Sequence, residues 1–355
     1  MNLILPLAGL SSRFPGMKPK WLLTHPNGNL MITEAIKGLD LSLVKNIYLV
    51  VLKQHLDGFD VERHISDQFK EFASDKKIVI TVLDEPTKNQ PETVYQAITR
   101  NNIQGSIFIK DCDNYFTTKI EHENSVCVFN LNDMDLVHAR NKSYAVFDHT
   151  KIIKNIVEKK VVSSDFCVGG YSFESSDIFI EYFNKLKEKS DLYISHLIYQ
   201  MILDGLIFKA SQASNYIDWG TLVEWNRYKS QYATLFVDLD GTLVKNSGQF
   251  FEPHWGTTKG ISDNVTSINK LHEGGKVQII LTTARKEEYR DATIKQLRKE
   301  GIKYHQIIFG LYHGKRIVIN DYAKTNPYKS CDAINIKRDS SDLKEMLEES
   351  LGFPI

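Results

Sequence analysis

The feature that most constrains this chain is an apolar run that comes late in it. Residues 233–244 read ATLFVDLDGTLV, where the apolar stretch ends in two aspartates one residue apart, followed by Gly-Thr. Such a run is typical of the buried strand that opens an α/β domain. Roughly two thirds of the chain precede it, so the sequence indicates an earlier domain as well. The polar stretch 226–232 marks the boundary, and we expect one domain over 1–230 and a second over 231–355.

Composition and charge exclude several classes of protein. Of the 355 residues, 42% are apolar and 25% are charged, which is ordinary for globular domains that each have a core. The 44 acidic and 44 basic residues cancel, so no net field attracts nucleic acid or an anionic membrane surface. The N-terminal stretch MNLILPLAGLSSRFPG has no basic residue ahead of its apolar part, and it reaches Gly and Arg too early for a signal peptide or a membrane span. We therefore expect neither a nucleic acid nor a membrane partner, and we interpret this stretch as a buried strand.

Cysteine usage indicates the compartment. The chain has four cysteines and no C-x-x-C pair, and it is long enough to fold without disulfides. We expect reduced, mostly buried thiols and a cytoplasmic protein. The sequence leaves a homo-oligomer open.

Short apolar runs alternate with amphipathic segments along the first domain. This alternation predicts a mixed, mostly parallel sheet with helices on both faces. Residues 143–173 interrupt the alternation with three short strands separated by polar turns, which indicates a hairpin-type insert. The expected strands are 2–7, 46–52, 78–83, 105–109 and 125–130, and the expected helices include 32–38, 91–100, 175–187 and 191–204.

The same alternation restarts after residue 233 and predicts a second α/β domain. The segments between 243 and 277 and between 284 and 315 are too short to hold a large cap. The expected strands here are 234–237, 277–281, 306–309 and 316–319, and the expected helices are 263–273, 287–301 and 340–350.

The first apolar run delivers a loop of small residues and two cations. Small residues let backbone N–H groups approach phosphate oxygens closely, and fixed positive charge suits a triphosphate. The loop contains neither G-K-[ST] nor G-x-G-x-x-G, so it is not a Walker loop or a dinucleotide fingerprint. The cations are Arg13 and Lys20, which we expect to be catalytic. The residues expected to bind the nucleotide here are Leu7, Ala8, Gly9, Ser11 and Ser12.

This loop resembles the signature of the sugar-phosphate nucleotidyltransferases, also called pyrophosphorylases, which reads approximately A-G-x-x-x-R-x-x-P with P-K-x-L-L downstream. Here the proline comes one residue early. Further segments follow in the family's order: QPETVYQAI at 90–98, IKDCDNYF at 109–116, IVEKK at 156–160 with VGGYSF at 168–173, and YIDWGT at 216–221. The resemblance covers about residues 1–230 and implies a Rossmann-like nucleotidyltransferase domain.

The resemblance also implies a reaction and its residues. A phosphate oxygen of a sugar or polyol phosphate attacks the α-phosphorus of a nucleoside triphosphate, and pyrophosphate leaves. The family binds Mg²⁺ with two acids, here Asp113 and Asp218, with Asp111 as the alternative to Asp113. Carboxylate oxygens are the ligands that this hard cation requires.

The remaining implied residues bind the base and the acceptor. Gln90 would contact the base, with Asp111 also in the nucleotide site. The D-x-D-x-[YF] pattern of IKDCDNYF is closer to small cytidylyltransferases than to thymidylyltransferases, which favours CTP, although Glu92 replaces a glycine common in the family. Glu158 would bind an acceptor hydroxyl and Lys159 the acceptor phosphate, with Gly169 in the same site.

The late D-x-D-G-T has chemistry of its own. A strand end can present Asp238 as a nucleophile toward phosphorus, while Asp240 protonates the leaving oxygen and later activates water. The pattern resembles the haloacid-dehalogenase-like phosphatases, most closely the small capsule-biosynthesis type. The resemblance implies that Thr283 in VQIILTTAR hydrogen-bonds the phosphoryl group. It also implies that Asp321 in RIVINDYAK binds Mg²⁺ together with Asp238 and Asp240.

One motif of the phosphatases departs from the pattern. A lysine is expected at position 311, where this chain has leucine, so Lys315 or Lys324 would have to substitute. We expect a bifunctional cytoplasmic enzyme of capsule or other surface-polysaccharide synthesis. Two alternatives stay open: a nucleotidyltransferase with an inactive dehalogenase-like domain for docking or oligomerisation, and a phosphatase whose first domain only senses nucleotide.

Overall fold

The structure is a computed structural model that describes residues 1–57, 60–134, 139–321 and 331–355. The chain divides into two compact units, unit 1 (Met1–Trp225) and unit 2 (Asn226–Ile355). The division falls inside helix α7 (Leu222–Lys229), close to the boundary expected at residue 230.

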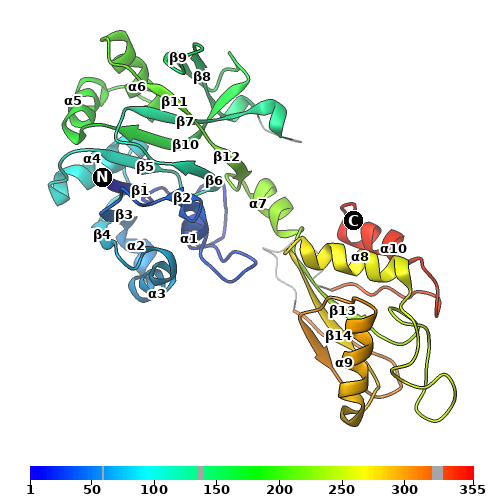
Figure 1. Cartoon of the computed structure of the whole chain (residues 1–355). Coiled ribbons are helices and arrows are strands. Elements are labelled where there is room, and N and C mark those ends of the chain that lie inside the picture. Colours follow the sequence, from blue (N-terminus) through cyan, green and yellow to red (C-terminus); the bar gives the residue numbers. More distant parts are fainter. Residues whose placement is uncertain (58–59, 135–138, 322–330) are drawn as a thin grey trace. The chain divides into compact units, whose positions relative to one another are not determined.

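Unit 1 is built on a nine-stranded mixed sheet (Figure 1). Its central path runs β11-β7-β10-β5-β1-β3-β4, and along this path β10 alone is antiparallel to its neighbours. The hairpin β8–β9 joins the sheet through β10, so the insert expected over 143–173 is this hairpin alone, because its third strand, β10, belongs to the central path. The mixed sheet is confirmed, but its strand pairs are mostly parallel only along the central path, because every pairing of β8, β9 and β10 is antiparallel. The strands are β1 (Asn2–Pro6), β3 (Asn46–Leu52), β4 (Lys77–Leu83), β5 (Ile107–Lys110), β7 (Ser125–Asn130), β8 (Ser143–Phe147), β9 (Ile153–Glu158), β10 (Asp165–Phe173) and β11 (Lys209–Gln212).

Helices cover both faces of this sheet because its strands are apolar on both sides. Successive side chains of a strand point to opposite faces. Along β3, Leu49 packs into one buried cluster with residues of α1 and α3, whereas Val50 packs into another with residues of α4, α5 and α6. Two cores result, one on each face. The helices are α1 (Met31–Ile36), α2 (Lys53–Leu56), α3 (Val61–Ala73), α4 (Gln90–Asn101), α5 (Ser176–Leu186) and α6 (Ile194–Leu203).

A small second sheet in unit 1 was not expected from the sequence. It consists of β12 (Ser214–Asp218), β6 (Asn114–Lys119) and β2 (Leu39–Asp40), in that order. β12 pairs antiparallel with β6, and Asp218 lies opposite Asn114. The backbone N–H of Trp219 also donates to the carbonyl of Asp113, at 2.8 Å. This pairing joins two acidic segments that lie about a hundred residues apart in the sequence.

Unit 2 has a three-stranded parallel sheet in the order β13-β14-β15. Its buried cluster combines residues of α8, α9 and α10 with residues of β13 and β14, and α8 lies beside α10 (Figure 1). The elements are β13 (Ala233–Asp238), α8 (Ser262–Glu273), β14 (Val277–Thr282), α9 (Arg290–Lys299), β15 (Gln306–Ile308) and α10 (Leu343–Leu351). These agree with the expected strands and helices before residue 310 and with the last helix.

The strand predicted at 316–319 is wrong. Residues 315–321 form neither helix nor strand, and Ile317, Val318 and Ile319 are 73%, 58% and 93% exposed. A run of consecutive apolar residues fits a buried strand by pattern alone, but a strand also needs a neighbour for its backbone hydrogen bonds. The described part of the sheet ends at β15, and this run pairs with none of its strands.

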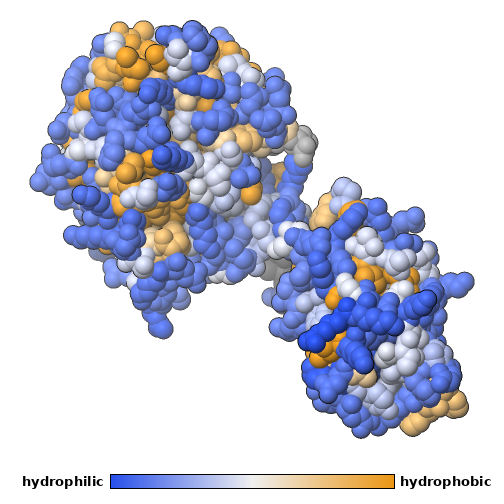
Figure 2. Space-filling model, viewed as in Figure 1, coloured by the Kyte–Doolittle hydropathy of each residue, from blue (hydrophilic) through white to orange (hydrophobic). Residues whose placement is uncertain are grey.

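The surface carries polar residues with apolar patches between them, as the view in Figure 2 shows. Large exposed apolar side chains include Phe250 and Phe251 in unit 2, at 76% and 81% exposure. Among the described helices, none combines the length and the apolarity needed to cross a membrane.

The junction of α1 with the small sheet gives a test of the fold. A Cβ added to Gly38 would lie 2.1 Å from the backbone oxygen of Phe116, in β6, and backbone cannot move aside cheaply. We expect Gly38→Ala to lower the free energy of unfolding of unit 1 by about 1–3 kcal/mol. Gly9→Ala is the control, because a Cβ there would meet nothing within 4 Å. Thermal melts that show equal stability for both variants would contradict the described packing of β6 against Gly38.

Candidate active site

One cavity in unit 1, of about 480 Å³, collects most of the residues predicted for nucleotidyl transfer. It is lined by segments that lie far apart in the chain. The predicted site residues in its wall are Arg13, Gln90, Asp111, Asp113, Glu158, Lys159, Gly169 and Asp218.

The loop after β1 leads from the core to this cavity. Leu7 and Ala8 are buried, and the N–H of Leu7 still donates to the carbonyl of Val50 at 2.8 Å, whereas Gly9 and Ser12 are exposed. The hydroxyl of Ser11 accepts from the N–H of Lys20 at 3.0 Å, at the start of the 3₁₀ turn η1 (Lys20–Leu22). This bond closes the loop.

Asp113 holds both cations of the loop. Lys20 Nζ lies 2.6 Å and an Arg13 guanidinium nitrogen 3.3 Å from Asp113 Oδ2. Burial alone would raise the pKa of Asp113, but the charges of Lys20 and Arg13 hold it well below its usual range. Burial likewise opposes the charge of Lys20, and Asp113 overcomes this so that the pKa of Lys20 is raised. The loop cations are therefore fixed at an ionised carboxylate.

Asp218 faces the same space as Asp113. A Cβ added to Gly220 would lie 3.0 Å from Asp218 Oδ1, 3.5 Å from an Arg13 nitrogen and 3.6 Å from Asp113 Oδ2. Glycine thus keeps a gap open between two carboxylates and a cation. The N–H of Gly220 also donates to Asp218 Oδ1 at 2.9 Å, which fixes the orientation of that carboxylate.

The two facing carboxylates fit Mg²⁺ as an ion that nucleotide phosphates also bind. Among the residues that the structure describes, no three His, Cys, Asp or Glu side chains form a group that could hold a metal ion. Mg²⁺ bound to nucleotide phosphates, however, needs only one or two protein carboxylates and completes its shell with phosphate and water oxygens. Asp113 and Asp218, on either side of the gap at Gly220, suit that role.

The two acids of IKDCDNYF occupy different surroundings. Gln90 Nε2 donates to Asp111 Oδ1, and a Cβ on Gly169 would lie 2.3 Å from Asp111 Oδ2. Burial and the nearby charge of Asp113 raise the pKa of Asp111 to about 6. Asp111 therefore lies against Gln90 at the start of α4 and against Gly169 in β10, whereas Asp113 faces the loop cations.

The predicted acceptor residues form another part of the wall. Glu158, at the end of β9, accepts from the hydroxyls of Ser143 and, at 2.6 Å, Ser195 at the start of α6. Lys159 has a φ of +54° and donates to the phenol oxygen of Tyr193, with its ammonium 4.3 Å from the centre of that ring. Both residues, which lie at and just after the end of β9, are thus held by side chains at the start of α6.

Lys142 is a wall residue that no motif indicated. Its Nζ donates to Asp218 Oδ2 and, at 2.8 Å, to the phenol oxygen of Tyr216. The residue stands just before β8, where the sequence reads NKSYAV and carries no signature. Only the pairing of β12 with β6 brings Asp218 near it.

Lys110 is a second residue that the sequence did not single out. Its side chain is fully buried, and Nζ donates to Asn114 Oδ1 at 2.6 Å and to the carbonyls of Asn114 and Asp111 at 3.0 and 2.7 Å. Burial lowers its pKa to about 8. These bonds hold the turn 111–114 in shape, and with it both aspartates.

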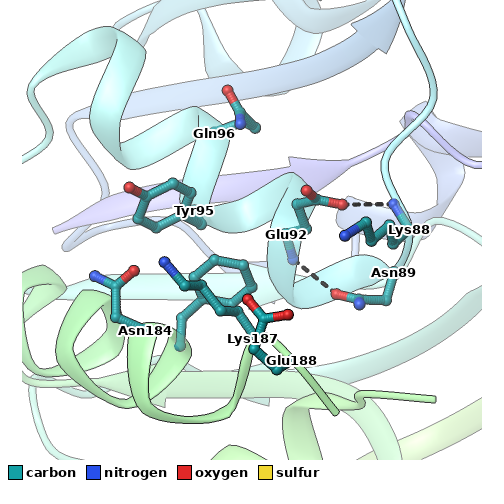
Figure 3. A pocket seen from close by; sticks show the side chains of 9 residues that line it. Lys88, Asn89, Glu92, Tyr95, Gln96, Asn184, Lys187 and Glu188 are labelled. Carbon is teal, nitrogen blue, oxygen red and sulfur yellow. Dashed lines mark hydrogen bonds between the residues drawn. The ribbon is translucent and has the colours of Figure 1, made fainter. Parts of the chain in front are cut away.

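A smaller cavity of about 150 Å³ lies between α4 and α5 (Figure 3). There Glu92 Oε2 accepts from the N–H of Lys88 at 2.5 Å, and the N–H of Glu92 donates to Asn89 Oδ1 at 3.0 Å. These bonds cap the start of α4. None of the residues predicted for the reaction lines this cavity, so we place the candidate site in the larger one.

Unit 2 gathers part of the predicted phosphatase set. Arg285 is fully buried and binds both oxygens of Asp240, at 2.8 and 2.9 Å. The hydroxyl of Ser247 donates to Asp240 Oδ1 at 2.7 Å, and the buried Thr283 hydroxyl lies 3.5 Å from Oδ2. Arg285 and Ser247 were missed by sequence reasoning, although the arginine ends the motif VQIILTTAR.

The rest of that set is not brought together. A guanidinium nitrogen of Arg316 donates to Asp238 Oδ1 at 3.0 Å. Lys315 and Asp321 lie in the exposed segment 315–321, and Lys324 is outside the described residues. Within the described ranges Asp321 does not form a three-acid group with Asp238 and Asp240, because no such group occurs there.

Comparisons with known proteins bear on the fold. The sequence matches no protein-family model and no curated protein. Solved structures do match, over 64% of the chain, a share close to that of unit 1. One is a nucleoside-diphosphate-sugar pyrophosphorylase from Vibrio cholerae RC9, 20% identical with a TM-score of 0.54, of which 98% is covered.

Two further solved structures support the same fold. One is a candidate glucose-1-phosphate thymidylyltransferase from Bacillus anthracis in complex with sucrose, 20% identical with a TM-score of 0.52 and 92% covered. The other is a UDP-glucose pyrophosphorylase complexed with UDP-glucose, 12% identical with a TM-score of 0.50 and 96% covered. The chain thus contains, over about two thirds of its length, the α/β fold with a mixed sheet of the sugar nucleotide pyrophosphorylases.

Proposed function

We propose that unit 1 transfers a nucleotidyl group from a nucleoside triphosphate, with CTP favoured, to a sugar or polyol phosphate. The observation that carries this proposal is a cavity whose wall combines Arg13 with two facing carboxylates and polar acceptor residues, and in which Asp113 also binds Lys20. The fold of solved pyrophosphorylases supports it as well. Pyrophosphate would be the second product.

The chemistry explains why the site is rich in charge. The acceptor phosphate is already an anion, so its oxygen attacks the α-phosphorus without a strong base, and the bond to pyrophosphate breaks. The protein has to hold two anions together and offset the charge of the transition state. When the triphosphate binds, Arg13 and Lys20 would leave Asp113 and pair with the phosphate oxygens instead. Mg²⁺, when held by Asp113 and Asp218, supplies further neutralisation of phosphate charge.

Gln90 gives a reason to favour CTP. One N–H of its Nε2 donates to Asp111, which leaves its carbonyl oxygen and a second N–H for a base. The amino groups of cytosine and adenine can donate to this oxygen, whereas O4 of uracil and thymine cannot. The neighbouring Asp111 fixes which end of the amide is presented.

A matrix of four nucleoside triphosphates against sugar and polyol phosphates, read as pyrophosphate release, tests this function. We expect CTP to be the best donor. Lys20→Met should lower kcat roughly 10²–10³-fold, because it removes a preorganised charge from the triphosphate. Lys154→Met is the control, since Lys154 pairs with Asp148 at 2.9 Å on the exposed side of the β8–β9 hairpin and is itself 58% exposed. Equal rates for the two variants would argue against this site.

For unit 2 we propose a Mg²⁺-dependent phosphatase. Asp238 would attack the substrate phosphorus to form an aspartyl-phosphate, while Asp240 protonates the leaving alcohol oxygen; Asp240 then removes a proton from the water that hydrolyses this intermediate. Gly241, with a φ of +85°, allows the turn that presents both acids, and Thr283 lies beside Asp240. Together the two activities would serve a cytoplasmic pathway to capsule or other surface polysaccharide.

A second candidate for unit 2 is a docking or oligomerisation domain without activity. The ion pairs favour it: Arg316 lies on the proposed nucleophile, and Arg285 binds both oxygens of the proposed acid. Each arginine occupies carboxylate oxygens that the reaction would use, so both pairs would have to open before these acids could act.

Phosphate release distinguishes the two candidates for unit 2. If the unit is a phosphatase, Asp238→Asn should abolish Mg²⁺-dependent release of phosphate from sugar and polyol phosphates and leave pyrophosphate release intact, because the amide cannot act as the nucleophile. Asp291→Asn, an exposed acid of α9, should change neither. Release that survives Asp238→Asn, or a wild-type protein that releases none, would instead support the inactive domain.

A further inference from the structure

Lys142 is the best-placed charged group of the large cavity that the motifs leave unexplained. Its side chain is 15% exposed, and it is paired with Asp218, one of the two facing carboxylates. Its ammonium lies 5.3 Å from the ring centre of Tyr216 and 5.7 Å from that of Phe166. Aromatic faces attract a cation without neutralising it, so among these neighbours Asp218 alone carries a charge that offsets that of Lys142.

The backbone of Lys142 ties it to the acceptor wall. Its carbonyl accepts from the N–H of Lys159 at 3.0 Å. Its neighbour Ser143 donates to Glu158. Lys142 therefore connects the carboxylate pair on one side with the predicted acceptor residues on the other, although it belongs to neither motif.

Each of the facing carboxylates is bound by a lysine. Lys20 lies on Asp113 and Lys142 on Asp218. A divalent cation between these acids would compete with both ammonium groups for the same oxygens, and like charges at such distances repel. A lysine has a long flexible stem and three donors, so its ammonium can move to a nearby anion while its backbone stays fixed. For Lys142 that anion would be the acceptor phosphate in the adjacent wall.

We propose that Lys142 is an exchanging catalytic cation: it neutralises Asp218 when the site is empty and binds the acceptor phosphate when a divalent cation takes that carboxylate. This inference rests on the proposed nucleotidyl transfer and adds a residue to it. It also implies that Lys142 would be free to bind the acceptor phosphate only when Asp218 is paired with a divalent cation instead.

The test compares Lys142→Met with Lys142→Arg and with the control Lys154→Met. Without substrates, Lys142→Met should bind Mn²⁺ several-fold more tightly than wild type, measured by electron paramagnetic resonance, because the competitor for Asp218 is gone. In turnover it should lose about 10²-fold in kcat/KM for the acceptor while KM for the nucleotide changes little. Lys142→Arg keeps the charge and should bind Mn²⁺ as weakly as wild type. Lys154→Met should match wild type in both assays.

Two outcomes overturn the proposal: Mn²⁺ affinity that is equal or weaker in a folded Lys142→Met, or acceptor kinetics that this variant leaves unchanged. If Lys142→Met melts below the assay temperature, Lys142→Arg decides, and Mn²⁺ binding tighter than that of wild type overturns the proposal. A wild-type protein that releases no pyrophosphate with any substrate pair contradicts the proposed function. The Mn²⁺ affinities then still decide whether Lys142 competes for Asp218.

Discussion

The pairing of β12 with β6 is the constraint on which the candidate site of unit 1 depends. It sets Asp218 opposite Asn114 and therefore next to Asp113, and Gly220 keeps the space between the two carboxylates open. Two neighbouring and largely buried carboxylates would repel each other strongly if no cation lay beside them. Lys20 and Lys142 pair with these carboxylates and compensate this repulsion in the absence of ligand, in addition to the roles proposed for them in the reaction.

Long, regular elements were predictable from sequence, and short edge pairings were not. β3 was expected at 46–52 and occurs there, because every residue after Asn46 is apolar and buried on one face or the other. β12 has five residues, two of them exposed at its start, so no periodicity distinguishes it from a loop. Conversely, the run at 316–319 had the pattern of a strand but lies exposed, because pattern cannot reveal whether a pairing partner exists.

Site residues were predictable where one short motif contains the residue types that the chemistry needs. The loop with Arg13 and Lys20 and the acids at 111 and 113 are short segments whose residue types already suit phosphate and metal. Lys142, Ser195 and Tyr193 could not be found in this way, because each acts through a partner that only the tertiary fold brings near. The pairing of Arg285 with Asp240 is intermediate: the arginine ends a motif, but only the structure shows what it binds.

The two units differ in the cationic side chains that pair with their carboxylates. In unit 2, Arg285 binds both oxygens of Asp240. Its guanidinium group also donates to Thr293 at 3.1 Å and Gln296 at 2.8 Å, so these bonds fix its position. In unit 1, Asp218 is paired with Lys142, and Asp113 with Lys20 and the largely exposed Arg13. A lysine has a flexible stem, so it could leave its carboxylate for a phosphate when a divalent cation takes its place. A locked arginine has no such route, so a substrate at Asp240 would have to draw that carboxylate itself out of the pair. The proposed transfer in unit 1 therefore asks lysines to move, whereas the proposed phosphatase activity of unit 2 asks a locked ion pair to open.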